Sequence, residues 1–349
     1  MVKSSVMIPP VKTLILFGGG SLIVEFARKS IKRNIKTYIF AVTRHLEEVI
    51  DIENSLTLKV ALEKEGIPFY HTKDINDSPE LRSIVSEATV GIGVGEAYTF
   101  NKETIELFKG RLFDFMVIRL PQYRGGAHFT WQILRRDRIG CWNIQIINEE
   151  MIPGVYDSGE ILRTREYTIP QWARIPQDYF KIANEEALRL FIEFMDEIQE
   201  GKEFKLNRLE ENISSYFPRL YTLKHGFINW SWDTDDLETL ICAFDDPYAG
   251  ASTFLNGNRV FLKKCYAEHK EGIFHPFMSG LVYRISNGSV FIATKDGALI
   301  VRSVMDEKGN NILHNIKPGQ RLYTPQKYLE EAILFNAEYD TEGLMKGRD

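Results

Sequence analysis

The chain has 349 residues, of which 44% are hydrophobic and 26% are charged, and its formal net charge is −5 at pH 7. This length and composition are typical of a globular protein with room for two domains. The acidic balance argues against a protein that holds nucleic acid by a broad basic surface. No apolar run approaches the roughly 18 residues of a membrane span, and the first residues lack the apolar core of a signal peptide.

The three cysteines are scattered without CxxC spacing. This pattern predicts buried thiols in a reduced compartment rather than a zinc site or a disulfide framework. We therefore expect a soluble, cytoplasmic protein that neither spans a membrane nor binds a metal.

Strand and helix patterns alternate along the first part of the chain. In chain order, we expect a strand at 12–17, a glycine turn at 18–20, a helix at 21–33, strands at 37–42 and 67–71 around a helix at 55–65, a helix at 77–88, a strand at 90–95, a helix at 102–108, strands at 113–118 and 142–149, and a long helix at 178–199. Such alternation predicts a Rossmann-like α/β fold with a mostly parallel sheet and helices on both faces. The Gly18–Gly20 turn is neither a GxGxxG nor a Walker loop, but it leaves helix N–H groups open to a ligand.

The pattern changes after about residue 205, where hydrophobic periodicity falls towards two. Asn256-Gly257, Asn287-Gly288 and Asp296-Gly297 stand between strand patterns and predict hairpins. We therefore expect a catalytic domain over 1–205, a small β-rich domain over 206–325, and a C-terminal helix and tail over 326–349.

Two glycine-rich loops carry candidate functional residues. The loop LPQYRGGAHFTW (120–131) offers Gly125 and Gly126 for close backbone approach to a ligand, Arg124 for a phosphate or carboxylate, and Trp131 for stacking. The same residues also suit a surface loop with one satisfied arginine. In the second loop, GVYDSGEI, Asp157 suits acid–base chemistry at the carboxyl end of the sheet, or a simple turn.

The order of these segments resembles the formyltransferase family, closest to the sugar N-formyltransferases, which are related to methionyl-tRNA formyltransferase. The resemblance rests on LPQYRGG followed about 30 residues later by GVYDSGEI, and on FINWSW, AFDDPYAGASTFLNG and FHPF in the second half. It implies formyl transfer from N10-formyltetrahydrofolate to the amine of a nucleotide-linked amino sugar. In that family a His acts as the base, an Asn stabilises the oxyanion and an Asp orients the His.

The resemblance also assigns binding residues. We expect the cofactor at Val94, Gly95, Tyr98 and Leu120. The substrate is expected at Arg44, Arg124, Gly125, Gly126 and Trp131. The acidic segment 185–212 disfavours tRNA phosphates and therefore favours the sugar. The sequence does not decide between a monomer and a homodimer.

The catalytic pair departs from the family pattern. Counting back from Leu120-Pro121, Asp114 stands at the Asn position and Met116 at the His position. An ionised carboxylate only accepts hydrogen bonds, and a thioether cannot act as a base. Asp157 keeps the third family position, and His128 and Glu96 are ionisable groups in nearby segments.

Three interpretations remain open. The chain still formylates, with His128 or Glu96 as the substitute base. Alternatively, the fold serves another one-carbon or acyl transfer, or hydrolysis. In the third interpretation it is a noncatalytic binder of a nucleotide sugar or a folate. His128 and Glu96 also suit a solvent-exposed loop histidine and a solvated carboxylate.

Overall fold

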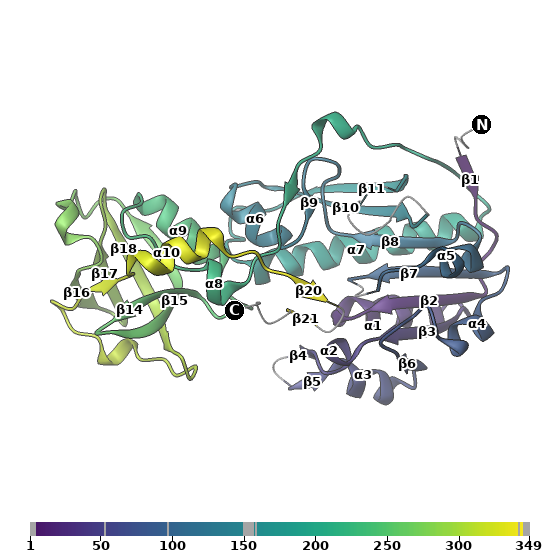
Figure 1. Cartoon of the computed structure of the whole chain (residues 1–349), viewed down its shortest axis with the longest axis horizontal. Helices are drawn as coiled ribbons and strands as arrows, with labels where there is room; N and C mark the ends of the chain where they lie inside the picture. The colour runs from purple at the N-terminus through teal and green to yellow at the C-terminus, as the bar shows by residue number, and fades with distance from the viewer. Residues whose placement is uncertain are drawn as a thin grey trace.

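Two β-sheets organise the chain, one toward each end of the long axis of the molecule (Figure 1). The computed structural model describes residues 5–51, 54–95, 98–148, 157, 159–340 and 343–344. The first sheet has seven strands and the second has six. Among the described residues, no helix is both long enough and apolar enough to cross a bilayer.

The seven-stranded sheet has the order β11-β10-β8-β7-β2-β3-β6. Its strands are β2 (Thr13–Gly18), β3 (Lys36–Ala41), β6 (Phe69–His71), β7 (Thr89–Val94), β8 (Leu112–Met116), β10 (Ile139–Ile146) and β11 (Ile161–Thr168). The five strands from β6 to β8 are parallel, whereas β10 and β11 are antiparallel to their neighbours. The chain moves outward from β2 through β3 and then returns to the other side of β2 as β7. This reversal creates a switch point at the carboxyl ends of β2 and β7.

Helices cover both faces of this sheet, as expected. One face carries α1 (Gly20–Ile31), α3 (Leu58–Glu65) and α7 (Pro176–Gln199), and the other carries α4 (Pro79–Ile84) and α5 (Lys102–Phe108). Alternate residues of β2 serve the two cores: Leu14 and Leu16 belong to the first, and Ile15 and Phe17 to the second. The buried alternation explains why β2 reads as a continuous apolar run.

The six-stranded sheet is antiparallel, with the order β16-β17-β18-β15-β14-β19. Its strands are β14 (Ala251–Leu255), β15 (Asn258–Glu268), β16 (Val282–Ser286), β17 (Ser289–Ala293), β18 (Ala298–Asp306) and β19 (Leu322–Tyr323). Each of the three expected hairpins forms, and Asn256 and Gly257 have the positive φ angles, 51° and 81°, that such a turn requires. The α/β fold with a β-rich C-terminal part is therefore confirmed.

The remaining elements are short. They are β1 (Ser5–Met7), α2 (Thr43–Leu46), β4 (Val49–Asp51), β5 (Leu56–Thr57), β9 (Arg124–Gly125), α6 (His128–Leu134), β12 (Glu203–Lys205), β13 (Tyr216–Phe217), α8 (Thr222–His225), α9 (Thr234–Ala243), α10 (Gln326–Leu334), β20 (Tyr339–Asp340), β21 (Gly343–Leu344), and three 3-10 turns at Glu211–Ile213, Pro276–Met278 and Leu313–Asn315.

Three local expectations differ from the structure. The segment 120–131, expected as a loop, contains β9 and the start of α6. The helix expected at 77–88 covers only Pro79–Ile84. Strand β11 was not expected, because charged side chains occupy both of its faces and obscure its period of two, with Arg163 and Arg165 on the face toward α7 and Glu166 on the other.

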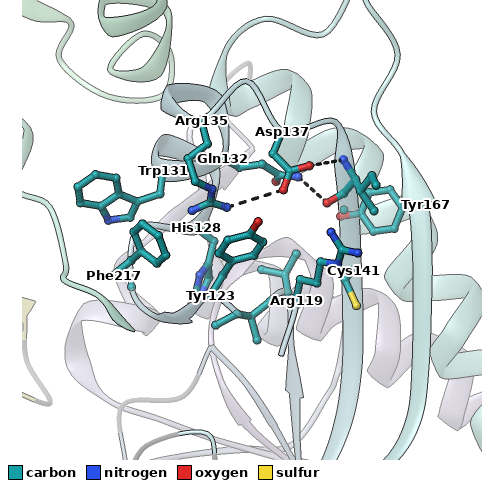
Figure 2. A pocket seen from close by; sticks show the side chains of 15 residues that line it. Arg119, Tyr123, His128, Trp131, Gln132, Arg135, Asp137, Cys141, Tyr167 and Phe217 are labelled. Atoms are coloured by element: carbon teal, nitrogen blue, oxygen red, sulfur yellow. Dashed lines mark hydrogen bonds and ion pairs between the residues drawn. The ribbon is translucent and has the colours of Figure 1, made fainter. Parts of the chain in front are cut away.

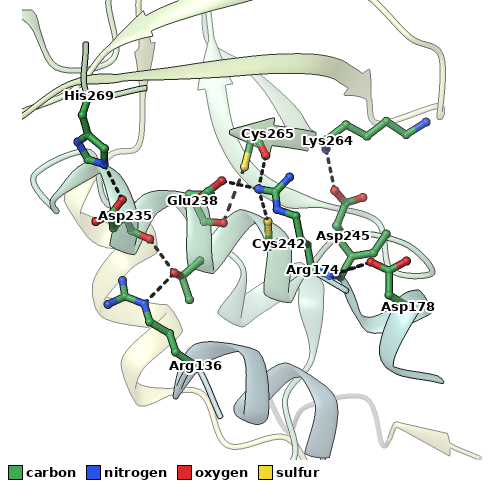
Figure 3. A network of polar contacts seen from close by, with 12 residues as sticks. Arg136, Arg174, Asp178, Asp235, Glu238, Cys242, Asp245, Lys264, Cys265 and His269 are labelled. Carbon is green, nitrogen blue, oxygen red and sulfur yellow. Dashed lines mark hydrogen bonds and ion pairs between the residues drawn. The ribbon is translucent and has the colours of Figure 1, made fainter. Parts of the chain in front are cut away.

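A polar network joins the two parts of the molecule at α9 (Figure 3). The Arg174 guanidinium, just before α7, donates to the Glu238 carboxylate and, at 2.7 Å, to the Cys265 carbonyl oxygen. It also lies 4.1 Å from the centre of the Tyr266 ring. After α6, Arg136 pairs with Asp236 at 2.8 Å. Cys265 and the other two cysteines are buried free thiols.

Candidate functional site

An open cavity of about 400 Å³ lies at the switch point of the parallel sheet. It is lined by Gly19, Gly20, Arg44, His45, Glu48 and Gly95. The glycines follow the carboxyl ends of β2 and β7, and the three polar residues come from α2 and its end, after β3. Open α/β sheets bind ligands in this crevice, and the volume falls in the range of small-molecule sites.

The glycines give the cavity its shape. Gly20 and Gly95 have φ angles of 81° and 62°, and a Cβ atom on either would meet no atom within 4 Å. Their missing side chains therefore leave space for a ligand rather than for protein. Gly19 serves another purpose, because a Cβ there would lie 2.8 Å from Cγ of His45. A larger residue at position 19 would displace the imidazole.

The polar wall of the cavity combines a cation, an imidazole and a carboxylate. His45 is only 5% exposed, and its Nδ1 has no hydrogen-bond partner. Burial, reinforced by the positive charge of Arg44, lowers the pKa of His45 to about 4, so that the imidazole is neutral at pH 7. Glu48 is exposed as a residue, but its carboxylate accepts a hydrogen bond from the Gly20 N–H. Loss of surrounding water raises the pKa of Glu48, while that N–H and Arg44 oppose the rise.

Asp157 and Gly125 meet beside the loop that follows β8. The Gly125 N–H points to Oδ2 of Asp157 at 3.4 Å. Burial raises the pKa of the Asp157 carboxyl, and the Gly125 N–H, Arg124 and Arg219 act in the opposite direction. Asp157 thus lies in a crowded environment with two arginine charges close by, which suits a group that orients or exchanges a proton.

A second, much smaller cavity lies under this loop (Figure 2). Its volume of about 20 Å³ accommodates roughly one water molecule. Arg135 lies 3.7 Å above the centre of the Tyr123 ring on one side, and Tyr167 closes the other side. The Nε atom of Arg135 and the hydroxyl of Tyr167 are buried without a partner. One water molecule placed there would satisfy such groups.

Among the expected cofactor residues, Gly95 lines the larger cavity and Val94 is the last, buried residue of β7. Tyr98 packs among Phe17 and Phe100, and its hydroxyl donates to the Thr72 carbonyl oxygen at 2.9 Å. Leu120 precedes Pro121 at the start of the loop after β8 and is partly buried. The structure therefore brings Gly95 to the cavity and gives Tyr98 a packing role in the core.

The expected substrate residues divide between two places. Arg44 lines the larger cavity, whereas Arg124, Gly125, Gly126 and Trp131 contact the segment that leads to the second sheet. Arg124 pairs with both carboxylate oxygens of Glu211, at 2.6 and 2.7 Å. This pairing, together with the parallel β9–β13 contact, holds residues 211–217 against the loop.

Close approach of this segment explains the two loop glycines. Gly125 has φ 110°, and a Cβ atom there would lie 1.9 Å from the Phe217 carbonyl oxygen. At Gly126 a Cβ would lie 2.3 Å from Cγ of Arg219. Trp131 donates from Nε1 to the Pro218 carbonyl oxygen at 2.8 Å. The backbone of Gly125 and Gly126, expected to lie close to a ligand, instead lies close to another segment of the chain.

The expected catalytic residues are also separated. Asp114 and Met116 lie on one face of β8, both partly exposed, with the buried Phe115 between them. His128 is the first residue of α6, not a loop residue in solvent, and it lines the smaller cavity. Burial and the charges of Arg219 and Arg135 lower the pKa of His128 to about 4. Glu96 falls outside the described residues.

His45, Glu48 and Arg219 were not among the residues expected from the sequence. The signal for the first two is positional, because TRHLEE follows a buried parallel strand, where functional side chains gather. No motif marks Arg219, which follows the segment 211–217 along the chain and packs against the loop at Gly126. No cluster of three or more His, Cys, Asp or Glu side chains that could hold a metal ion occurs within the described part of the chain.

Comparisons with known proteins give a consistent family of relatives. Residues 222–314 match the family model described as formyl transferase, C-terminal domain. Methionyl-tRNA formyltransferase of Clostridium tetani is 23% identical over 288 residues, which cover 80% of this chain and 88% of that protein.

Solved structures give a similar result. The N-formyltransferase of Helicobacter canadensis, in complex with folinic acid and dTDP-3-aminofucose, has a TM-score of 0.59 at 16% identity, over 83% of this chain and 98% of that one. WlaRD, a sugar 3N-formyl transferase in the presence of dTDP and 5-N-formyl-THF, has a TM-score of 0.58 at 18% identity, over 84% and 97% of the two chains. At these identities the likeness establishes the shared fold.

Proposed function

Because this chain belongs to the formyltransferase family, we propose that it transfers a formyl group from N10-formyltetrahydrofolate to the amine of a nucleotide-linked amino sugar. The observation that carries this proposal is the open cavity of about 400 Å³ at the switch point of the sheet. It combines glycine backbone, a cation and a carboxylate in one wall, which suits a ligand with both an anionic group and an amine.

The residues present fit a folate group at this end of the sheet. Gly95 leaves open space in front of its backbone. The backbone of Gly95 would hold the flat part of the cofactor, with Val94 behind it, and the opposite wall of Arg44, His45 and Glu48 would be left to the acceptor. Bound there, N10-formyltetrahydrofolate would supply the electrophilic formyl carbon.

The chain's own residues would then orient the acceptor and take up its proton. Asp157, held beside the Gly125 N–H, is suited to positioning or proton exchange because its pKa is raised by burial. Met116 cannot accept a proton, and an ionised Asp114 cannot donate a hydrogen bond to an oxyanion. Removal of a base costs roughly 100- to 10,000-fold in rate, and removal of an oxyanion donor roughly 100- to 1,000-fold. We therefore expect slow turnover unless other groups take over both tasks.

A sugar is favoured over tRNA as the acceptor by charge. The net charge is −5, and the helix α7 and the segment after it carry many exposed acidic side chains. A polyanion binds to surfaces that release its counterions through Lys and Arg contacts. The WlaRD and Helicobacter canadensis structures contain dTDP and a dTDP-amino sugar, respectively, which supports the same choice.

A noncatalytic binder of a nucleotide sugar or a folate is the second candidate function. The specific observation in its favour is the pair Asp114 and Met116 at the positions where the resemblance expects Asn and His. This candidate predicts that a nucleotide sugar raises the melting temperature without being converted.

One experiment separates these functions. Purified protein is incubated with N10-formyltetrahydrofolate and dTDP-, UDP- or GDP-linked amino sugars, and in parallel with methionyl-tRNA. Products are measured by mass spectrometry. Formamide on a sugar supports the proposal. Formation of formyl-methionyl-tRNA would identify the tRNA, and not the sugar, as the acceptor, and free formate would indicate hydrolysis.

A pair of variants tests the site itself. Asp157→Asn should lower turnover at least 100-fold, as expected for a group that assists proton transfer. The matched control, Asp77→Asn, changes an exposed carboxylate between β6 and α4 and should leave turnover unchanged. Equal rates for both variants would remove Asp157 from the mechanism.

A further inference from the structure

Opposite charges share one wall of the switch-point cavity. Arg44 lies in α2, and Glu48 follows that helix, so that both side chains line the same 400 Å³ space. A wholly anionic ligand would be repelled by Glu48, and a wholly cationic one by Arg44. The wall is complementary to a molecule that carries an anion and an amine.

The backbone fixes the position of Glu48. Its N–H donates to the His45 carbonyl oxygen at 3.3 Å, and its own carbonyl oxygen accepts from the Leu58 N–H at 2.9 Å. The side chain is further held by the Gly20 N–H at the start of α1. A carboxylate has about four acceptor positions, so one backbone donor leaves room for the N–H groups of a ligand.

His45 provides a second, independent indication of a ligand. It is 95% buried, it lines the cavity, and its Nδ1 makes no hydrogen bond to any residue that the structure describes. A buried polar atom without a partner is uncommon in a folded protein and is costly unless water or a ligand satisfies it. With its proton on Nε2, the neutral imidazole would offer Nδ1 as an acceptor to an amine beside the Glu48 carboxylate, whereas phosphate oxygens need donors.

We propose that Glu48 binds the amino group of the acceptor and that Arg44 binds its phosphate. This inference rests on the proposed function, because it takes the nucleotide-linked amino sugar as the ligand, and it goes beyond it by assigning the selection of an amine to one residue. Selectivity arises because a neutral hydroxyl can still donate to the Glu48 carboxylate but lacks the positive charge of an ammonium group, so the ion pair is lost.

Binding measurements test the proposal without turnover. Isothermal titration calorimetry of the full-length chain compares a dTDP-linked amino sugar with the dTDP-linked sugar that has a hydroxyl at the same carbon. The wild-type protein should bind the amine about tenfold more tightly. Glu48→Gln, which keeps the shape and the acceptor for Gly20, should reduce this ratio to about one.

Three controls complete the experiment. Glu47→Gln changes the adjacent exposed carboxylate, which does not line the cavity, and should keep the tenfold ratio. Glu48→Asp keeps the charge and should retain most of it, which excludes a general folding defect. Arg44→Gln should weaken both ligands by the same factor.

The outcomes also distinguish this inference from the proposed function. If Glu48→Gln retains the tenfold ratio, or if the wild-type protein shows no preference for the amine, the role of Glu48 is overturned whether or not formyl transfer is found. If the wild-type protein binds neither ligand, the proposed substrate and the role of Glu48 are both overturned. A preference that depends on Glu48, without formamide production, supports this inference and contradicts the transferase function.

Discussion

The two cavities at the carboxyl edge of the sheet are built in opposite ways. The switch-point cavity is open, measures about 400 Å³, and two of its glycines, Gly20 and Gly95, have empty space in front of them. The smaller cavity measures about 20 Å³, and its glycines Gly126 and Gly140 pack against side chains of the chain itself, those of Arg219 and Tyr167. Glycine therefore has two roles in this protein. At the switch-point cavity it leaves room for a ligand, and beside the smaller cavity it allows two segments of the chain to pack tightly.

This difference changes the interpretation of the LPQYRGG segment. It is the most specific motif of the sequence, yet Arg124 and Gly125 make their strongest contacts to residues 211–217. Through them the loop beside Asp157 is coupled to the segment that leads into the second sheet. Among the described residues, none of the second sheet lines the larger cavity, so the proposed ligand site and the attachment of the two parts lie at separate places along one sheet edge.

The largest expected effect is on the free energy of unfolding when one methyl group is added to a glycine, either in the packed loop or in the open cavity. Gly125→Ala would put a Cβ atom 1.9 Å from the Phe217 carbonyl oxygen at a φ of 110°, so we expect a loss of about 3 kcal/mol in the free energy of unfolding. Gly95→Ala meets no atom within 4 Å and should cost only about 1 kcal/mol, from its φ of 62°. Urea unfolding measures both. Equal losses would contradict the distinction between the cavities.

The second prediction concerns pH, because each cavity contains a histidine with a lowered pKa. His45 and His128 both have pKa values of about 4, against 6.5 when unfolded. Between pH 6.5 and 4 the unfolded chain binds protons that the folded chain does not, so stability is full above pH 6.5 and is lost as the pH falls. We expect a contribution of about 3 kcal/mol from His128 and a smaller one, about 2 kcal/mol, from His45, because its imidazole borders an open cavity where solvent weakens the effect.

Single variants assign this loss. His45→Gln and His128→Gln should each flatten the decline in unfolding free energy between pH 6.5 and 4, when each variant is referred to its own value at pH 8. A decline as steep as that of the wild-type protein in His45→Gln would show that the open cavity leaves this imidazole well hydrated.

The third prediction tests the packed side alone. Trp131→Phe keeps the aromatic contact with Phe217 but removes the bond from Nε1 to the Pro218 carbonyl oxygen, so we expect a loss of about 1 kcal/mol. Trp172→Phe is the matched control, since Trp172 is 59% exposed. Differential scanning calorimetry compares the two variants. A similar melting temperature for both would mean that residues 211–218 are held by β9 and Arg124 without this bond.

Much of the fold could be predicted from the sequence because its signals are local. The apolar runs of β2 and β7, the periodicity of α7 and the Asn-Gly turns each depend on a few neighbouring residues. The site could be predicted only in part. Gly95 and Arg44, expected at the cofactor and at the substrate respectively, line one cavity because the carboxyl ends of parallel strands share one edge, and their roles there stay predictions.

Contacts between distant segments explain what the sequence did not reveal. Arg124 and Glu211 are separated by 87 residues, and nothing near Arg124 indicates that its partner would be the chain rather than a ligand. His128 looked like a loop residue because Gly125 and Gly126 precede it, but α6 begins at His128 and packs against α9. Glu48 carries no motif at all, and its position depends on β3, α2 and Gly20 together.

The smallest expected effect concerns Tyr339 in β20. Its ring lies 5.0 Å from the Arg219 guanidinium, and its hydroxyl donates to the Leu220 carbonyl oxygen at 3.3 Å. Burial raises the pKa of Tyr339, and the charges of Arg219 and Arg44 oppose that rise. Tyr339 therefore feels one arginine that acts on Asp157 and another that lines the open cavity.

Replacing this ring should expose Arg219 at little cost in stability. Tyr339→Ala should lower the free energy of unfolding by about 1 kcal/mol, because it removes a cation–π contact and the long hydrogen bond from the hydroxyl to the Leu220 carbonyl oxygen. With the ring removed, the Arg219 guanidinium should bind inorganic pyrophosphate about threefold more tightly in a calorimetric titration. Tyr339→Phe keeps the ring and should bind pyrophosphate as the wild-type protein does. Weaker binding by Tyr339→Ala would instead indicate that the ring holds Arg219 in the orientation that receives the anion. Tyr339 would then assist anion binding rather than shield Arg219 from solvent.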